Sequence, residues 1–194
     1  AAVPVRTYQA TLIQLDGPQK IPTARPRDAL PGRGGLELTV TSSLAGSLAG
    51  VREYMQGYPY ACIEQELSRA VALRDAARWR RWIERLPAYL DRDGLLRYFP
   101  SDAMPGEDVL TAYVLAIASE AGYAIPDELR QRMIEALQRF VDGRLVRGSA
   151  LPTADLAIRR LAAIEALSRY DAATPRMLDS IAIEPTLWPT SAVL

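Results

Sequence analysis

The chain contains one cysteine in 194 residues, and that cysteine lies three positions before a glutamine. Cys62 stands at the start of a run with helical spacing, in which Ile63 and Leu67 are apolar. Because residues i and i+3 share one face of a helix, the Cys62 thiol and the Gln65 carboxamide can meet. Loss of ammonia from such a pair gives an internal β-cysteinyl-γ-glutamyl thioester. The spacing therefore predicts an electrophile that is stored inside the protein.

A simpler interpretation of this cysteine is also open. Free cysteine is among the residue types that are most often buried, and it then behaves as a small apolar side chain. Cys62 stands beside an apolar helical run, so burial alone would account for its position. On this interpretation the helix only packs, and it carries no reactive bond.

The composition excludes several other kinds of site. The chain has no histidine, which removes the commonest general base and metal ligand, most zinc sites and any Cys-His arrangement. One cysteine permits no internal disulfide. Lysine plus arginine equals aspartate plus glutamate, 23 each, so the net charge does not favour nucleic acid or anionic lipid as a partner. With 49% apolar and 24% charged residues, the composition is typical of a soluble globular protein.

Arginine and tryptophan are mixed between positions 78 and 85, and such a mixture can bind nucleic acid. On a helix, however, arginines whose stems lie along a half-buried face are the commoner explanation. We therefore expect no nucleic-acid partner. The residues concerned are Arg78, Trp79, Arg80, Arg81, Trp82 and Arg85.

The cysteine stands in the stretch Tyr58-Pro59-Tyr60-Ala61-Cys62-Ile63-Glu64-Gln65, and Ser68-Arg69 follow. This stretch resembles the thioester segment of the α2-macroglobulin and complement family, in particular its bacterial members. The core motif there is Cys-x-Glu-Gln, commonly preceded by Tyr-Pro-Tyr-Gly, and Ala61 stands where that glycine is usual. Later segments look like further landmarks of the same helical domain: 94–100, 110–115, 122–126, 151–155 and 187–190.

The resemblance implies a protein that uses its thioester once, as a covalent trap. In this family, proteolysis of an exposed bait segment uncovers the bond. A lysine amine of the attacking protease then attacks the Gln65 carbonyl and releases Cys62 as a thiol. Such a protein is a broad-spectrum endopeptidase inhibitor rather than an enzyme, because nothing turns over. Its partners are target proteases and other domains of its own chain, and it needs no cofactor and no metal.

The resemblance also implies a location and a biological setting. A bacterial member would be periplasmic and anchored to the inner membrane through an N-terminus that this chain lacks. Export signals would then lie upstream of Ala1, and the role would be host defence or colonisation.

A thioester persists in water only where it is kept dry, and aromatic side chains beside it can exclude solvent. Tyr58 and Tyr60 flank the motif and are our candidates for this shielding, although both could equally anchor the turn by packing. Glu64 is a candidate for orienting the amide or for transferring a proton. A solvated carboxylate is also favourable at a helix start for electrostatic reasons alone.

The first 50 residues differ in sequence pattern from the rest of the chain. Val3, Val5 and residues 10–15 suggest short strands, and 36–41 alternates apolar and polar residues with the period of a half-buried strand. Residues 42–50 are small and polar enough for a linker. We interpret residues 1–50 as a β-strand and linker segment from a flanking β-sandwich-type domain, and 51–194 as the N-terminal part of the helical thioester domain.

From position 51 onward the apolar periodicity is helical. Glu107–Ala121 is apolar nearly all round, which predicts a helix that is buried on several sides. Periodicity supports a mainly α fold, and the resemblance implies an α/α toroid that is incomplete in this chain. The predicted helices cover 51–55, 62–90 with a break near Asp75 or at Pro87, 107–121, 126–141, 153–167, a short one from 174, and another that begins at 190.

Two alternatives stay open beside the covalent trap. The chain could be a helical interaction module with no functional thioester. It could also be an α/α-toroid enzyme, for which paired carboxylates or an Asp-rich metal motif are expected. The candidates for such a site are Asp91, Asp93, Asp102, Glu107 and Asp108, all in predicted turns or at a helix start.

Overall fold

The computed structural model describes residues 7, 9, 11–40, 49–148, 153–179 and 181. The chain divides into two compact units, Ala1–Arg52 and Glu53–Leu194. Some expectations fall outside the described residues: the strands at Val3, Val5 and Ala10, the linker over 42–48, the landmarks at 151–152 and 187–190, and the helix from 190.

In the first unit, the described residues 11–40 contain no strand. Leu36, Leu38 and Val40 were expected on one face of a half-buried strand, but they are 76%, 76% and 74% exposed. A strand needs a partner for its backbone groups and a surface for its apolar face, and alternation in the sequence supplies neither. The predicted strand is therefore not confirmed.

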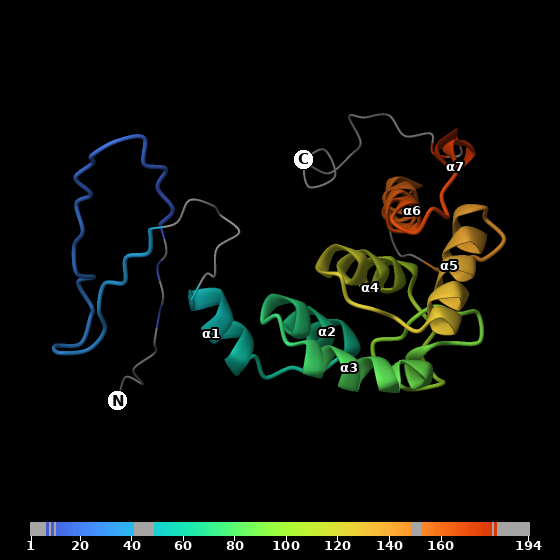
Figure 1. The fold of residues 1–194 in the computed structure, drawn as a ribbon, viewed down its shortest axis with the longest axis horizontal. Helices are drawn as coiled ribbons and strands as arrows, with labels where there is room; N and C mark the ends of the chain where they lie inside the picture. Colours follow the sequence, from blue (N-terminus) through green and yellow to red (C-terminus); the bar gives the residue numbers. More distant parts are fainter. Residues whose placement is uncertain are drawn as a thin grey trace. The chain divides into compact units, whose positions relative to one another are not determined.

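The second unit is built from helices (Figure 1). In chain order the helices are α1 (Ala49–Gly57), which begins in the first unit, α2 (Ile63–Ala72), α3 (Ala76–Arg85), the 3-10 helix η1 (Leu86–Tyr89), α4 (Asp108–Ala121), α5 (Asp127–Val141), α6 (Thr153–Ser168) and α7 (Pro175–Asp179). Isolated bridges join Leu90 to Leu96 and Leu96 to Glu107. The mainly α fold is confirmed. None of the described helices combines the length and apolar character needed to cross a bilayer.

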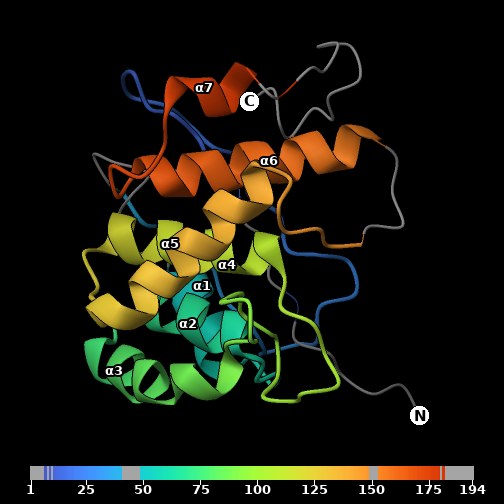
Figure 2. The ribbon, with the colours of Figure 1, turned by 90° about the vertical axis from the view of Figure 1, so that its right-hand side faces the viewer.

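Helix α4 forms the centre of this unit. It lies between α2 and α6, and α5 packs against both α4 and α6 (Figures 1 and 2). Leu110 and Val114 share one face of α4, Ala112 and Leu115 lie on other faces, and all four are buried. Each leucine or valine side chain contributes about 1.5–3 kcal/mol when it leaves water. Burial on several sides, predicted from the apolar character of this segment, is therefore confirmed.

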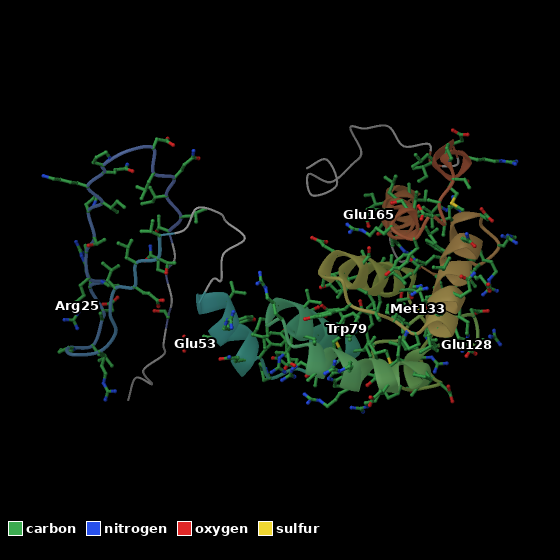
Figure 3. All side chains as sticks on the ribbon, viewed as in Figure 1. Arg25, Glu53, Trp79, Glu128, Met133 and Glu165 are labelled. Atoms are coloured by element: carbon green, nitrogen blue, oxygen red, sulfur yellow. The ribbon has the colours of Figure 1, made fainter. Side chains whose placement is uncertain are left out.

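The chain breaks between α2 and α3 at Asp75, one of the two places that the sequence predicted. Arg74 takes a left-handed backbone conformation with φ 55°. The Asp75 carboxylate then accepts a hydrogen bond from the Arg78 N–H at 2.8 Å and caps α3. Trp79 on α3 and Met133 on α5, marked in Figure 3, are both buried in the core of the unit.

Two of the four arginines of α3 contact neighbouring side chains of the same unit. Arg78 donates to the buried Glu66 of α2 at 2.7 Å, and Arg69 pairs with the same carboxylate at 3.1 Å. The Arg85 guanidinium lies over the Trp82 ring, 4.5 Å from its centre. These contacts favour the half-buried helix face over a nucleic-acid surface.

The loop between η1 and α4 is organised by one buried carboxylate. Asp91 Oδ1 accepts from the Asp93 and Leu95 N–H groups, both at 2.9 Å. Asp91 Oδ2 accepts from the Gly106 N–H at 3.0 Å and from Arg147 at 2.7 Å. Burial opposes the ionisation of Asp91, but these hydrogen bonds and the Arg147 charge outweigh it and hold its pKa below the usual value.

The lowered pKa of Asp91 predicts an acid-sensitive contribution to stability. The contribution is present above the ordinary aspartate value of 3.8 and is lost as the pH falls through the lower folded value. We expect Asp91→Asn to lower the free energy of unfolding by about 1–3 kcal/mol at neutral pH, because the amide N–H₂ faces the Gly106 or Arg147 donors. Urea unfolding of both proteins at neutral and acidic pH should show the difference shrinking in acid. A difference that does not change with pH would contradict this assignment.

Candidate functional site

The candidate site lies at the N-terminus of α2. Cys62 is the residue just before this helix and has an extended backbone, with φ −79° and ψ 166°. It is 6% exposed, and Ile63 and Leu67 behind it are fully buried. The Ile63 N–H donates to the Tyr98 carbonyl oxygen at 3.2 Å, which ties the start of α2 to the segment before α4. Cys62 is thus held in a fixed place at a helix start, as the sequence predicted.

The Gln65 carboxamide folds back over Cys62. The Cys62 N–H donates to Gln65 Oε1 at 3.1 Å. A glutamine at the third helical position commonly bonds the backbone of the capping residue in this way, because the first N–H groups of a helix have no partner within it. The ordinary physics of a helix start therefore brings the amide to the thiol-bearing residue and points a donor at its carbonyl oxygen.

Glu64 also contacts the cysteine. Its Oε2 is 3.9 Å from Cys62 Sγ. Its Oε1 is 3.0 Å from Ser68 Oγ, which in turn lies 2.8 Å from the Tyr113 hydroxyl of α4. The sequence interpretation gave Ser68 and Tyr113 no role. Ser68 follows Glu64 by four residues, a spacing that could have indicated contact, whereas Tyr113 lies 45 residues further on.

Tyr98 completes the polar surroundings of the site. Burial raises the pKa of its phenol, and the negative charges of Glu107 and Glu64 raise it further. The phenol therefore stays neutral under ordinary conditions, and it adds no charge beside the cysteine.

The tyrosines before Cys62 form an aromatic group of their own. The rings of Tyr58 and Tyr60 meet edge to face with centres 5.4 Å apart, and Tyr54 of α1 lies 5.4 Å from Tyr58. Tyr58 is half-buried, whereas Tyr60 is 63% exposed. Of the two candidates for shielding, Tyr58 is therefore the better covered in this unit.

Comparison with known proteins identifies solved structures that share the fold of this chain. No protein-family model and no curated protein matches the chain. The chain is similar to a crystal structure of native Escherichia coli α2-macroglobulin that spans domain MG7 to the C-terminus, with a TM-score of 0.59, 22% identity, and coverage of 69% of this chain and 25% of that one. It is also similar to a cryo-EM reconstruction of the native conformation of E. coli α2-macroglobulin, with a TM-score of 0.57, 23% identity, and coverage of 69% and 10%.

The chain shares its fold with part of bacterial α2-macroglobulin. It spans a quarter or less of the length of the two α2-macroglobulin chains that it matches. The similarity in fold covers 69% of this chain.

Within this fold, four of the five carboxylates that would indicate an enzyme pair with arginines of the same unit. Asp91 and Asp93 both pair with Arg147 at 2.7 and 2.8 Å. Asp108 is buried against Arg159, and the exposed Asp102 pairs with Arg97 at 2.9 Å. In the part of the chain that the structure describes, no group of three or more His, Cys, Asp or Glu residues is placed to hold a metal ion.

Proposed function

We propose that residues 51–194 are the N-terminal part of the thioester domain of a bacterial α2-macroglobulin-like inhibitor. On this proposal the parent protein inhibits a broad range of endopeptidases, and residues 1–50 belong to a flanking β-sandwich-type domain. The observation that carries the proposal is the Gln65 carboxamide folded over Cys62, with Oε1 at 3.1 Å from the Cys62 N–H. The fold shared with E. coli α2-macroglobulin supports it.

The thioester would react only once. Cys62 Sγ and the Gln65 side chain form a thioester, whose thiolate is a good leaving group. A lysine amine of a protease attacks the Gln65 carbonyl carbon, the bond to sulfur breaks, and the proton lost by the amine balances the thiol that is released. The Cys62 N–H is placed to stabilise the negative charge that develops on the carbonyl oxygen. Because nothing is regenerated, the protein acts as a trap rather than an enzyme.

The setting follows from the same proposal. The parent protein would be periplasmic and anchored to the inner membrane, with a role in host defence or colonisation. Its partners would be attacking proteases, bound through lysine amines, and the other domains of its own chain. The absence of histidine from this chain leaves amines and water as the expected acceptors.

Methylamine, a small amine, tests the bond directly. We expect the untreated full-length protein to lack one ammonia in its intact mass and to resist thiol reagents. Methylamine should then expose one thiol at Cys62 and leave one methylamide on Gln65, both mapped by peptide mass. Immediate labelling of Cys62 in freshly prepared protein, with no ammonia missing, would favour the alternative of a helical module without a functional thioester.

A second measurement tests whether the tyrosines before Cys62 shield the thioester from water. If Tyr58 and Tyr60 exclude water, Tyr58→Gly and Tyr60→Gly should hasten loss of the thioester without unfolding the domain. Because Tyr58 is the more buried, its replacement should have the larger effect. The measurement is the rate of thiol release with and without methylamine. Unchanged rates in both variants, with unchanged melting temperature, would assign the tyrosines to packing.

A further inference from the structure

The Glu64 carboxylate uses its two oxygens for two different partners. Oε2 faces Cys62 Sγ at 3.9 Å, which is within reach of a hydrogen bond from the thiol. Oε1 faces Ser68 Oγ at 3.0 Å. One oxygen is therefore held while the other remains available to the sulfur. This is the arrangement of a base that is oriented by a third group.

The hydroxyl protons of Ser68 and Tyr113 determine which group donates in each hydrogen bond that links Tyr113, Ser68 and Glu64. Ser68 Oγ carries one proton, and it lies 3.0 Å from Glu64 Oε1 and 2.7 Å from the Glu64 carbonyl oxygen. Both are acceptors, so the serine proton goes to Glu64. Ser68 Oγ must then accept from the Tyr113 hydroxyl, 2.8 Å away on α4. Tyr113 thus fixes Ser68, and Ser68 fixes the carboxylate.

The rest of the site leaves Glu64 as the group that can take a proton from the sulfur. The chain has no histidine to serve as a base. Tyr98 is also near, but burial and the surrounding negative charges raise the pKa of its phenol and keep it neutral. Among the described residues, Glu64 is the carboxylate whose contact with Cys62 Sγ lies within hydrogen-bonding distance.

We propose that Glu64 transfers the proton when the Cys62–Gln65 thioester forms and when it is cleaved, and that Ser68 and Tyr113 position its carboxylate. This inference rests on the proposed thioester. In formation, Glu64 Oε2 takes the thiol proton, Sγ attacks the Gln65 carbonyl carbon, and the carbon–nitrogen bond breaks. The leaving nitrogen receives the proton back from Glu64 and departs as ammonia. In cleavage, Glu64 takes a proton from the attacking amine and returns it to the Cys62 thiolate.

The test compares Glu64→Gln with wild type in the full-length protein. The variant should react with methylamine about 100-fold more slowly, because it can no longer take a proton. The fraction of molecules that lack one ammonia should also fall. Glu84→Gln, an exposed carboxylate on α3, is the matched control and should behave as wild type. A Glu64→Gln variant that forms the bond and reacts at the wild-type rate would overturn the inference.

Two replacements of Ser68 distinguish a role in positioning the Glu64 carboxylate from a role in helix stability. Ser68→Thr keeps the hydroxyl but introduces the poorer helix former, whereas Ser68→Ala removes the hydroxyl and introduces the better one. Positioning therefore predicts that Ser68→Ala slows the methylamine reaction about two- to tenfold and that Ser68→Thr restores most of the rate. Tyr113→Phe should slow the reaction by a similar factor. The opposite order of the two Ser68 variants would show that Ser68 acts through helix stability and overturn its assigned role.

The result with the wild-type protein distinguishes failure of the thioester proposal from failure of the proposed role of Glu64. If the wild-type protein shows no missing ammonia and no methylamine incorporation, the proposed thioester itself fails. If wild type shows both and Glu64→Gln is indistinguishable from it, the thioester stands and the role of Glu64 is rejected.

Discussion

Replacing Cys62 with alanine should abolish the covalent attachment of proteases to the full-length protein. In wild type, a protease that cuts the parent protein should become linked through one of its own lysines, at no more than one per thioester. In Cys62→Ala, Gln65 remains an ordinary amide with a poor leaving group, so no amine should displace it. The measurement is a denaturing gel of each protein mixed with protease, read for conjugates of high mass.

Two controls sharpen this result. Gln65→Ala should lose the conjugate as completely as Cys62→Ala, because the bond needs both side chains. Prior blocking of the protease lysines should lower the yield with wild type, since this chain has no histidine to redirect the bond to hydroxyl groups. Equal amounts of conjugate from wild type and Cys62→Ala would reject Cys62 and Gln65 as the trap.

The candidate bond was accessible to sequence reasoning because it is local. Cys62 and Gln65 are three residues apart at a helix start, where capping physics brings their groups together without help from distant segments. Ser68 was within reach of the same reasoning, because it follows Glu64 by one turn of α2. Tyr113 and Tyr98 were not. They reach the site only because α4 packs against α2 and because the Tyr98 carbonyl holds the Ile63 N–H.

The fold shows the same division between local and distant causes. The break at Asp75 could be predicted, since a capping carboxylate acts on the three residues that follow it. The strand over 36–40 was not confirmed, because alternation says nothing of a partner. The carboxylates between positions 91 and 108 were misleading for a different reason. Asp91 and Asp108 resemble members of a carboxylate site in the sequence, but their arginine partners lie 56 and 51 residues away.

The ion pair between Asp108 and Arg159 leads to the largest expected change in stability. Asp108 begins α4 and is 1% exposed, and Arg159 of α6 is 8% exposed. Arg159 Nε donates to Asp108 Oδ1 at 2.9 Å, and a second guanidinium N–H donates to Oδ2. The hydrogen bonds to Asp108 are the main reason why the pKa of Arg159 is raised. The pair thus joins α6 to the start of the helix that carries Tyr113.

Arg159→Leu should lower the free energy of unfolding by about 3–5 kcal/mol, because it leaves the Asp108 carboxylate buried without its partner. The double variant Asp108→Asn with Arg159→Leu should lose less than this, since no charge is then stranded. Arg169→Leu is the matched control: Arg169 is exposed just after the end of α6 and pairs with Glu165 and Glu120, so its loss should cost only about 0–1 kcal/mol. Urea unfolding of the four proteins measures all three differences. If Arg159→Leu costs no more than Arg169→Leu, then Asp108 is either solvated or satisfied by other donors, and the pair does not hold α6 to α4.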